Sequence, residues 1–286
     1  MAMREPVMIR AKGNGIQIQL ALWEGRGKTI LCIHGLTANC RFWDCQASAL
    51  SPTHRVLAMD LRGRGLSDKP PTGYSLREHG EDILALLNDQ GLDRPVLMGH
   101  SLGAFIALAF AAEHPQRVDR LILVDGGGKL SDVQMAKVFA GIKPSLDRLG
   151  RIFPTFEDYV SLMKEAPFLK PWNSFMETSF RYEIEEVEGG VRSRVHPKHI
   201  EEEAANLRKE DPTRIYSRVS CPTLILRATR GMLMEDDFVL PEDVAQRMER
   251  AIRNVKRIDL EGTNHYSILL QPNPVRDQAI LNFLEG

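Results

Sequence analysis

The feature that most constrains this chain is a regular alternation of short, β-rich apolar runs with helical stretches. In the first half, strand-like runs and helical patterns follow one another at residues 15–23, 29–33, 39–50, 55–61, 75–90, 95–98, 101–114 and 120–124. The runs ILCI (30–33) and LILV (121–124) are apolar on both parities, as is typical of a strand that is covered on both faces. The alternation therefore predicts an α/β fold with a mostly parallel central sheet and helices on both faces.

The alternation stops between Lys129 and Val219, where helical signals dominate. Ser131 and Thr155 are suited to cap helices, and Pro197 is suited to the first turn of a third. This region also holds ten of the chain's 19 aromatic residues. We expect a helical insertion whose aromatic side chains pack on the core and line a pocket.

After this region the alternation resumes. The patterns predict strands at residues 223–228 and 255–260 and helices at 241–252 and 267–284. The expected organisation is a core domain of residues 1–128 and 220–286, interrupted by a helical cap, or lid, of residues 129–219.

Composition narrows the classes of function. The 286 residues carry 37 basic and 38 acidic side chains, which argues against a nucleic acid or an anionic membrane as partner. The longest run without a polar side chain has eleven residues, against about 20 for a spanning helix. Residues 1–13 contain no apolar signal-peptide core, so we expect a cytoplasmic protein. The four cysteines form no C-x-x-C pair or zinc-finger spacing, and we expect idle thiols and no metal.

The sequence GHSLG at residues 99–103 directly follows a predicted strand and opens a predicted helix. A serine on such a sharp turn adopts strained backbone angles and stands clear of the sheet. Gly99 and Gly103 remove Cβ atoms that would collide there, and the amide of Leu102 is aimed at the same space. This context predicts that Ser101 is a nucleophile.

Together with other motifs, this turn resembles the α/β-hydrolase fold superfamily, in particular serine esterase-like members with a helical cap. The residues that carry the resemblance are His34-Gly35 after a strand, DLRGRGLSD (60–68), GHSLG (99–103), PTLIL (222–226) and GTNH (262–265). The resemblance spans nearly the whole chain. It is far more specific for the fold than for the substrate.

Of the eight histidines, His265 is the expected general base. It follows the last predicted strand, and loops after parallel strands emerge at one edge of the sheet, where the GHSLG turn also lies. The resemblance places the family's histidine at the same position. His196 and His199, spaced i, i+3, suit zinc, but no cysteine or carboxylate cluster accompanies them.

Three aspartates are candidates for the acid that orients the histidine. The resemblance implies a carboxylate between the serine and the histidine in chain order, usually in the loop after the strand that follows the insertion. Asp237, four residues before Pro241, matches that spacing, so it is the preferred candidate. Its neighbour Asp236 and the earlier Asp125, at the end of the run 121–124, remain alternatives.

The resemblance also implies an oxyanion hole made by the backbone N–H groups of Leu36 and Leu102. It assigns Asp60 and Asp68 to bracing turns around Gly63 and Gly65. The two backbone donors leave no side-chain signature of their own, so their assignment rests on the resemblance alone.

A serine nucleophile with a base and an oxyanion hole performs acyl transfer, usually to water. The expected function is hydrolysis of carboxylic esters of small to medium, largely apolar substrates, without metal or organic cofactor. A lactonase and a carbon–carbon hydrolase are alternatives, although the latter commonly carry tryptophan after the histidine, where this chain has Tyr266. A binding or receptor protein with vestigial turnover is an alternative of another class. The oligomeric state, monomer or dimer, stays open.

Overall fold

The structure is a computed structural model that describes residues 4–286. Its centre is an eight-stranded sheet in the order β1-β2-β4-β3-β5-β6-β9-β10. The strands are β1 (Val7–Lys12), β2 (Gln17–Trp23), β3 (Thr29–Ile33), β4 (Arg55–Met59), β5 (Val96–His100), β6 (Arg120–Val124), β9 (Thr223–Ala228) and β10 (Val255–Leu260). Among the described strands of this sheet, β1–β2 and β2–β4 pair antiparallel and the other neighbours pair parallel, so the predicted mostly parallel sheet is confirmed.

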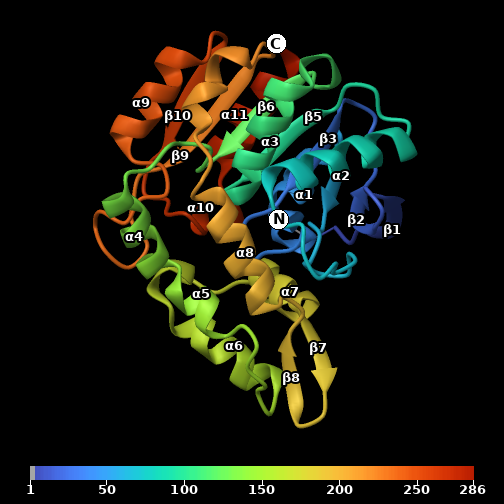
Figure 1. Cartoon of the computed structure of the whole chain (residues 1–286), viewed down its shortest axis with the longest axis vertical. Coiled ribbons are helices and arrows are strands. Elements are labelled where there is room, and N and C mark those ends of the chain that lie inside the picture. Colours follow the sequence, from blue (N-terminus) through green and yellow to red (C-terminus); the bar gives the residue numbers. More distant parts are fainter. Residues whose placement is uncertain (1–3) are drawn as a thin grey trace.

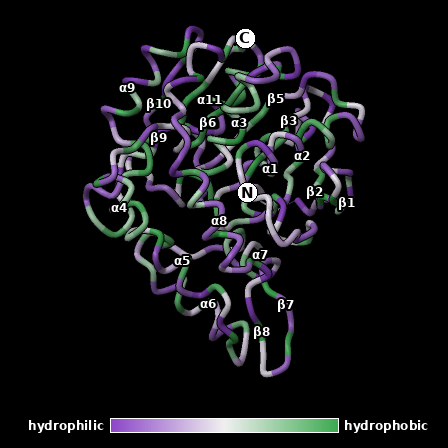
Figure 2. Tube along the Cα trace, viewed as in Figure 1, coloured by the Kyte–Doolittle hydropathy of each residue, from purple (hydrophilic) through white to green (hydrophobic). Residues whose placement is uncertain are grey.

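Helices cover both faces of this sheet (Figure 1). The helices of the core are α1 (Asp44–Leu50), α2 (Leu76–Asp89), α3 (Leu102–Glu113), α9 (Glu242–Ala251), α10 (Ser267–Leu270) and α11 (Pro274–Glu285). Helix α2 packs against α3, and α1 packs against α11. Strands β3 and β6 are buried apart from their first residues, as runs that are apolar on both parities require. Figure 2 shows hydrophobic residues concentrated along the central strands and α3.

Residues 129–219, which we call the inserted segment, leave the sheet after β6 and return to it at β9. They form α4 (Asp132–Gly141), α5 (Lys143–Asp147), α6 (Phe156–Glu165), α7 (Ser174–Glu183), β7 (Ile184–Val187), β8 (Gly190–Ser193) and α8 (Pro197–Leu207). The segment extends beyond one end of the sheet (Figure 1). The domain boundaries proposed from the sequence stay a prediction.

The structure differs from the expected elements in three places. The antiparallel hairpin β7–β8 lies where we expected helix, because its two strands have only four residues each and leave little periodicity. The edge strand β1 was missed because its side chains are mostly exposed and lack a clear alternation. The single closing helix is two, α10 and α11, since Asn273 caps a new helix that begins at Pro274.

No helix within residues 4–286 is both long and apolar enough to cross a bilayer. Residues 1–3, part of the stretch in which no signal-peptide core was found, lie outside the described residues. All four cysteines are buried and unpaired.

Candidate active site

Ser101 lies at the junction of β5 and α3 with φ 55° and ψ −119°. A positive φ is costly for a residue with a side chain and marks a turn that the surrounding structure enforces. The two flanking glycines explain how the turn fits. A Cβ on Gly99 would lie 2.1 Å from the carbonyl oxygen of Gly103, and one on Gly103 would lie 2.0 Å from that of Ile33. The predicted sharp turn around Ser101 is therefore present.

His265 follows β10 in the loop that leads to α10, and its ring is almost completely buried. Its Nδ1 atom lies 2.8 Å from Oδ2 of Asp125. His265 and Ser101 line the same two cavities, described below. The loops after β5 and β10 thus meet at one edge of the sheet, as the parallel topology predicts.

Asp125 is the residue immediately after β6, and it has a positive φ of 45°. Its Oδ1 atom accepts a hydrogen bond of 3.1 Å from the backbone N–H of Ala228 at the end of β9. With Oδ2 on His265, both carboxylate oxygens have a partner, and the group is 2% exposed. A carboxylate fixed in this way makes Nδ1 the protonated nitrogen of the ring, because only an N–H can donate to it.

The expected contact between His265 and Asp237 is wrong. The carboxylate of Asp237 instead accepts hydrogen bonds from the backbone N–H groups of Met232, Leu233 and Met234, the last two at 2.8 and 3.1 Å. It closes its own loop, which the spacing to Pro241 could not reveal. Its neighbour Asp236 is mostly exposed and pairs with Lys137 of α4.

The loop after β3 is held by His34, which is fully buried. Nε2 of His34 accepts from the N–H of Leu61 at 3.0 Å, so Nδ1 carries the proton and donates to the carbonyl of Gly35 at 2.7 Å. Burial lowers the pKa of His34 to about 3, which keeps the ring neutral. The Gly35 carbonyl and the Leu36 N–H belong to one planar trans peptide, in which the C=O and N–H bonds point in opposite directions. The hydrogen bond from His34 to the carbonyl therefore also fixes the direction of the Leu36 N–H.

Both proposed oxyanion donors lie near Ser101. Leu36 and Ser101 line the same cavities, and a Cβ built on Gly35 would lie 3.2 Å from Cβ of Ser101. Leu102 is the first residue of α3, and N–H groups in the first turn of a helix have no partner within the helix. Leu36 and Leu102 therefore both lie beside Ser101, and the role of their N–H groups as oxyanion donors stays a prediction.

His100 contacts His265 through both its ring and its Nε2 atom. Its ring stacks on that of His265 with centroids 4.5 Å apart, and its Nε2 donates to the carbonyl of His265 at 2.9 Å. Burial, followed by the neighbouring charge of His265, lowers the pKa of His100 well below its usual value. A neutral His100 fixes the backbone that carries His265.

Two adjoining cavities meet at Ser101 and His265. The first, of about 40 Å³, is bounded by the Gly35–Ala38 loop, His100 and Tyr266. The second, of about 70 Å³, is almost wholly apolar. Its other lining residues are Leu36, Leu102, Phe105, Leu130, Met135, Val138, Phe139, Ile142, Ala204, Leu207 and Val239.

The inserted segment therefore supplies much of the apolar wall, from α4 and α8. Of its ten aromatic residues, only Phe139 lines either cavity, so aliphatic side chains carry the role that we expected of aromatics. The others pack elsewhere; for example, Phe168 stacks on Tyr266 with centroids 4.6 Å apart.

The other predicted polar residues have structural partners. Nδ1 of His196 accepts the N–H of Lys198 and caps α8, and the ring of His199 stacks on Tyr74. Asp60 accepts N–H groups of Cys40 and Leu66, which fits its assigned bracing role. Within residues 4–286 no three His, Cys, Asp or Glu side chains gather in a way that could hold a metal ion.

Asp125 was weighed as an alternative but not preferred. The sequence shows it only as an acidic residue after a strand and before Gly126-Gly127-Gly128. Its positive φ and its bond to Ala228 depend on the neighbouring strand β9, which no local pattern reveals.

Comparison with known proteins gives the family. Residues 28–272 match the family model of the α/β-hydrolase fold. The chain is 27% identical over 271 residues to 2-(acetamidomethylene)succinate hydrolase of Mesorhizobium japonicum, covering 92% of this chain and 90% of that protein. It is 41% identical over 111 residues to an uncharacterised protein of Mycobacterium bovis, where the match covers 39% of this chain and only 33% of that protein.

A solved structure of E-2-(acetamidomethylene)succinate hydrolase superimposes on 98% of this chain and 100% of its own, with a TM-score of 0.85 and 23% identity. At that identity the likeness concerns the fold. The family match covers most of the chain and agrees with the sheet order and with the strained turn at Ser101. The chain therefore belongs to the α/β-hydrolase fold family.

Proposed function

We propose that the protein is a serine hydrolase that cleaves carboxylic esters of small to medium, largely apolar substrates. The observation that carries the proposal is a strained serine beside a histidine held by a buried carboxylate, at the mouth of an apolar cavity. In it, Ser101 is the nucleophile, His265 the base and Asp125, in place of the expected Asp237, the acid. The small-molecule ester is the proposed partner, and the cytoplasm is the proposed location.

The proposed reaction has two halves. Oγ of Ser101 attacks the ester carbonyl carbon while Nε2 of His265 takes the serine proton. The carbonyl oxygen, which gains negative charge, accepts hydrogen bonds from the N–H groups of Leu36 and Leu102. The C–O bond to the alcohol then breaks, and His265 protonates the departing alkoxide. Water, deprotonated by His265, cleaves the acyl-enzyme and restores Ser101.

The lining of the two cavities supports an uncharged acyl group. The relative from Mesorhizobium japonicum is named for a substituted succinate, which carries two carboxylates. Binding such a substrate favours arginine or lysine at the site, because buried carboxylates need charged or hydrogen-bonding partners. Neither cavity beside Ser101 is lined by lysine or arginine. An apolar acyl chain fits this lining better than a dicarboxylate does.

The test is a matched pair of activated esters. We expect p-nitrophenyl butanoate to be hydrolysed with at least about tenfold higher kcat/KM than p-nitrophenyl hemisuccinate, which adds a carboxylate at similar length. A preference for the hemisuccinate would contradict the apolar substrate class. Lactones and a vinylogous diketone, assayed alongside, test the two alternative reactions. Stoichiometric binding of esters without turnover would favour the receptor alternative.

A further inference from the structure

A buried arginine touches the loop that carries the Leu36 amide. Arg64 lies in the loop after β4 and is completely buried. Its Nε donates to the carbonyl oxygen of Leu36 at 3.1 Å, and its Nη1 donates to the carbonyl oxygen of Arg62 at 3.0 Å. A guanidinium offers its donors in a rigid planar fork, so these bonds fix the position of one carbonyl relative to the other.

The third contact of Arg64 comes from the inserted segment. Its Nη2 lies 3.0 Å from Oε2 of Glu203, a residue of α8 that is 1% exposed. The same oxygen lies 2.8 Å from Nε2 of His79 on α2. Glu203 is therefore the counter-charge that allows Arg64 to be buried next to the Leu36 loop, since an unpaired charge in that place would be costly.

The two peptide units on either side of Leu36 are thus held by different side chains. His34 holds the Gly35 carbonyl and with it the Leu36 N–H, and Arg64 holds the Leu36 carbonyl. With both units fixed, the backbone angles of Leu36 have little freedom. A donor of an oxyanion hole needs this preorganisation, because an amide that must reorient during the reaction loses much of its effect.

Helix α8 also reaches the apolar cavity. Ala204 and Leu207 of this helix line the cavity that adjoins Ser101, and they lie one and four residues after Glu203. Glu202, one residue before, accepts the N–H groups of Gly73 and Tyr74 at 2.9 and 3.1 Å and so docks the helix on the core. One short helix therefore both bounds the acyl cavity and supplies the partner of Arg64.

We propose that Arg64 and Glu203 are positioning residues for the oxyanion hole, tying helix α8 to the carbonyl of Leu36. An acyl group seated against Ala204 and Leu207 then acts on the helix that keeps the Leu36 amide in place. The inference rests on the proposed function for the role of the Leu36 amide. It extends that function by making the inserted segment part of the apparatus that stabilises the oxyanion.

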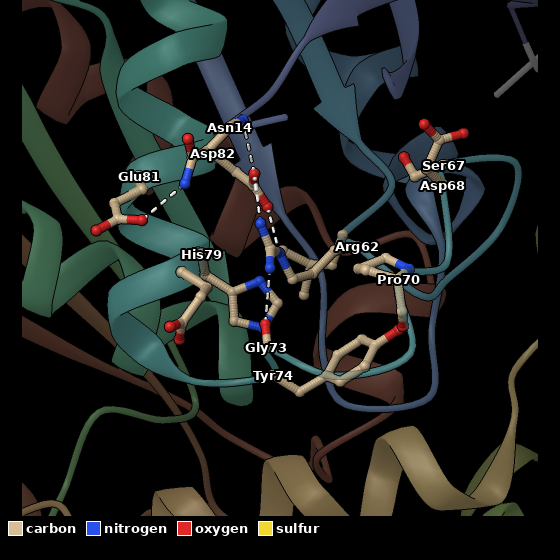
Figure 3. A network of polar contacts seen from close by, with 12 residues as sticks. Asn14, Arg62, Ser67, Asp68, Pro70, Gly73, Tyr74, His79, Glu81 and Asp82 are labelled. Atoms are coloured by element: carbon tan, nitrogen blue, oxygen red, sulfur yellow. Dashed lines mark hydrogen bonds and ion pairs between the residues drawn. The ribbon is translucent and has the colours of Figure 1, made fainter. Parts of the chain in front are cut away.

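The same loop offers a matched control. Arg62 and Asp82 form a second buried ion pair, with Nε and Nη2 of the arginine at 2.7 and 2.9 Å from the two carboxylate oxygens. Figure 3 shows this pair between the loop and α2, with the Arg62 side chain also reaching Gly73. Its side chains hold Gly73 and Asn14 rather than Leu36. A merely structural role predicts similar effects for both pairs.

The test compares Arg64→Lys and Glu203→Gln with Arg62→Lys and Asp82→Asn. For the first two variants we expect kcat for p-nitrophenyl butanoate to fall about 10- to 100-fold with KM changed less than about threefold. A trifluoromethyl ketone forms an oxyanion adduct with the serine, so its affinity for these two variants should fall by a similar factor. The affinity of the matching methyl ketone should stay unchanged. The control variants should lower the melting temperature while kcat stays within about threefold.

Several results would overturn the proposal. An equal fall of kcat in both pairs, an unchanged kcat in Arg64→Lys and Glu203→Gln, or failure of both these variants to fold would each assign the pair a structural role only. The rate at which an organophosphonate labels Ser101 provides a separate readout, because its transition state also places charge on an oxygen. If the parent protein is labelled but hydrolyses no ester, the proposed substrate is wrong, while the labelling rates of the variants still test the positioning role.

Discussion

Replacing Asp125 by asparagine should abolish most of the activity through the tautomer of His265. The change removes one charge and almost no volume. In the parent, Oδ1 of Asp125 accepts from the N–H of Ala228 and Oδ2 faces Nδ1 of His265. The asparagine amide oxygen must stay at Ala228, since an NH₂ group there would oppose another donor. The NH₂ group then points at His265.

An NH₂ donor facing Nδ1 favours the ring with its proton on Nε2. That nitrogen can no longer take the proton of Ser101, so the general base is lost. We expect kcat to fall about 10²- to 10⁴-fold, equivalent to about 3 to 6 kcal/mol on the barrier at roughly 1.4 kcal/mol per tenfold. Steady-state kinetics with p-nitrophenyl butanoate, alongside thermal unfolding, measures the loss and separates it from a loss of folded protein.

Asp237→Asn is the matched control. Asp237 holds three backbone N–H groups of its own loop, so this variant should lose stability and keep kcat within about tenfold of the parent. The reasoning is refuted if Asp125→Asn stays nearly fully active while Asp237→Asn loses a hundredfold or more. That outcome would return the role of acid to the loop after β9.

Three further predictions follow from the same structure. Ser101→Ala should lose about 10⁴-fold or more in kcat and all labelling by an organophosphorus reagent, as measured by intact-protein mass spectrometry; labelling of another residue in the parent would contradict the assigned nucleophile. Leu207→Ala should raise the relative kcat/KM for longer acyl chains in a series of p-nitrophenyl esters. The reason is that the 70 Å³ cavity shares a wall with an adjoining cavity of about 110 Å³, formed by Leu207, Phe105, Leu130 and Met135. An unchanged dependence of kcat/KM on chain length would show that this wall does not limit the substrate. Burial raises the pKa of Glu203, but the contacts with His79 and Arg64 outweigh burial and lower the pKa from 4.5 to about 2. The contribution of Glu203 to the free energy of unfolding is therefore complete above about pH 4.5 and is lost as the pH falls toward 2. In denaturant titrations, Glu203→Gln should lose stability less steeply than the parent over this pH range, and an identical pH dependence in both proteins would contradict this.

Much of the fold followed from the sequence because its signals are local. The runs TILCI at 29–33 and TLILRA at 223–228 coincide with β3 and β9, since the central residues of a strand that is buried on both faces are apolar on both parities. The turn at Ser101 was predictable from the motif GHSLG and its place between a strand and a helix, although the contact that requires Gly103 comes from Ile33 of the neighbouring strand β3. Elements with weak periodicity or exposed faces, such as β1 and β7–β8, gave no comparable signal.

The acid was not predictable in this way, because two carboxylates satisfied the same rule of chain order. What separates them is the partner that each finds across the sheet. Asp125 directly follows β6, which lies beside β9, so its carboxylate accepts the N–H of Ala228 and also contacts His265. Asp237 has the spacing to Pro241 that suggested the role of acid, but its carboxylate accepts hydrogen bonds from backbone N–H groups of its own loop. The choice therefore depends on the order of strands and not on any spacing along the chain.

The loop of residues 230–240 has a different task, which its contacts define. Asp237 gathers the N–H groups of residues 232–234 and so closes the loop, while Val239 lines the apolar cavity beside Ser101. A Cβ on Gly141, at the end of α4, would lie 2.6 Å from Cε of Met232, so the loop packs directly on the inserted segment. A carboxylate that satisfies three buried or partly buried N–H groups is a stabilising device. Asp237 therefore holds the loop that packs on α4 and carries Val239, and we expect its loss to change the shape of the apolar cavity beside Ser101 more than the proposed proton transfer.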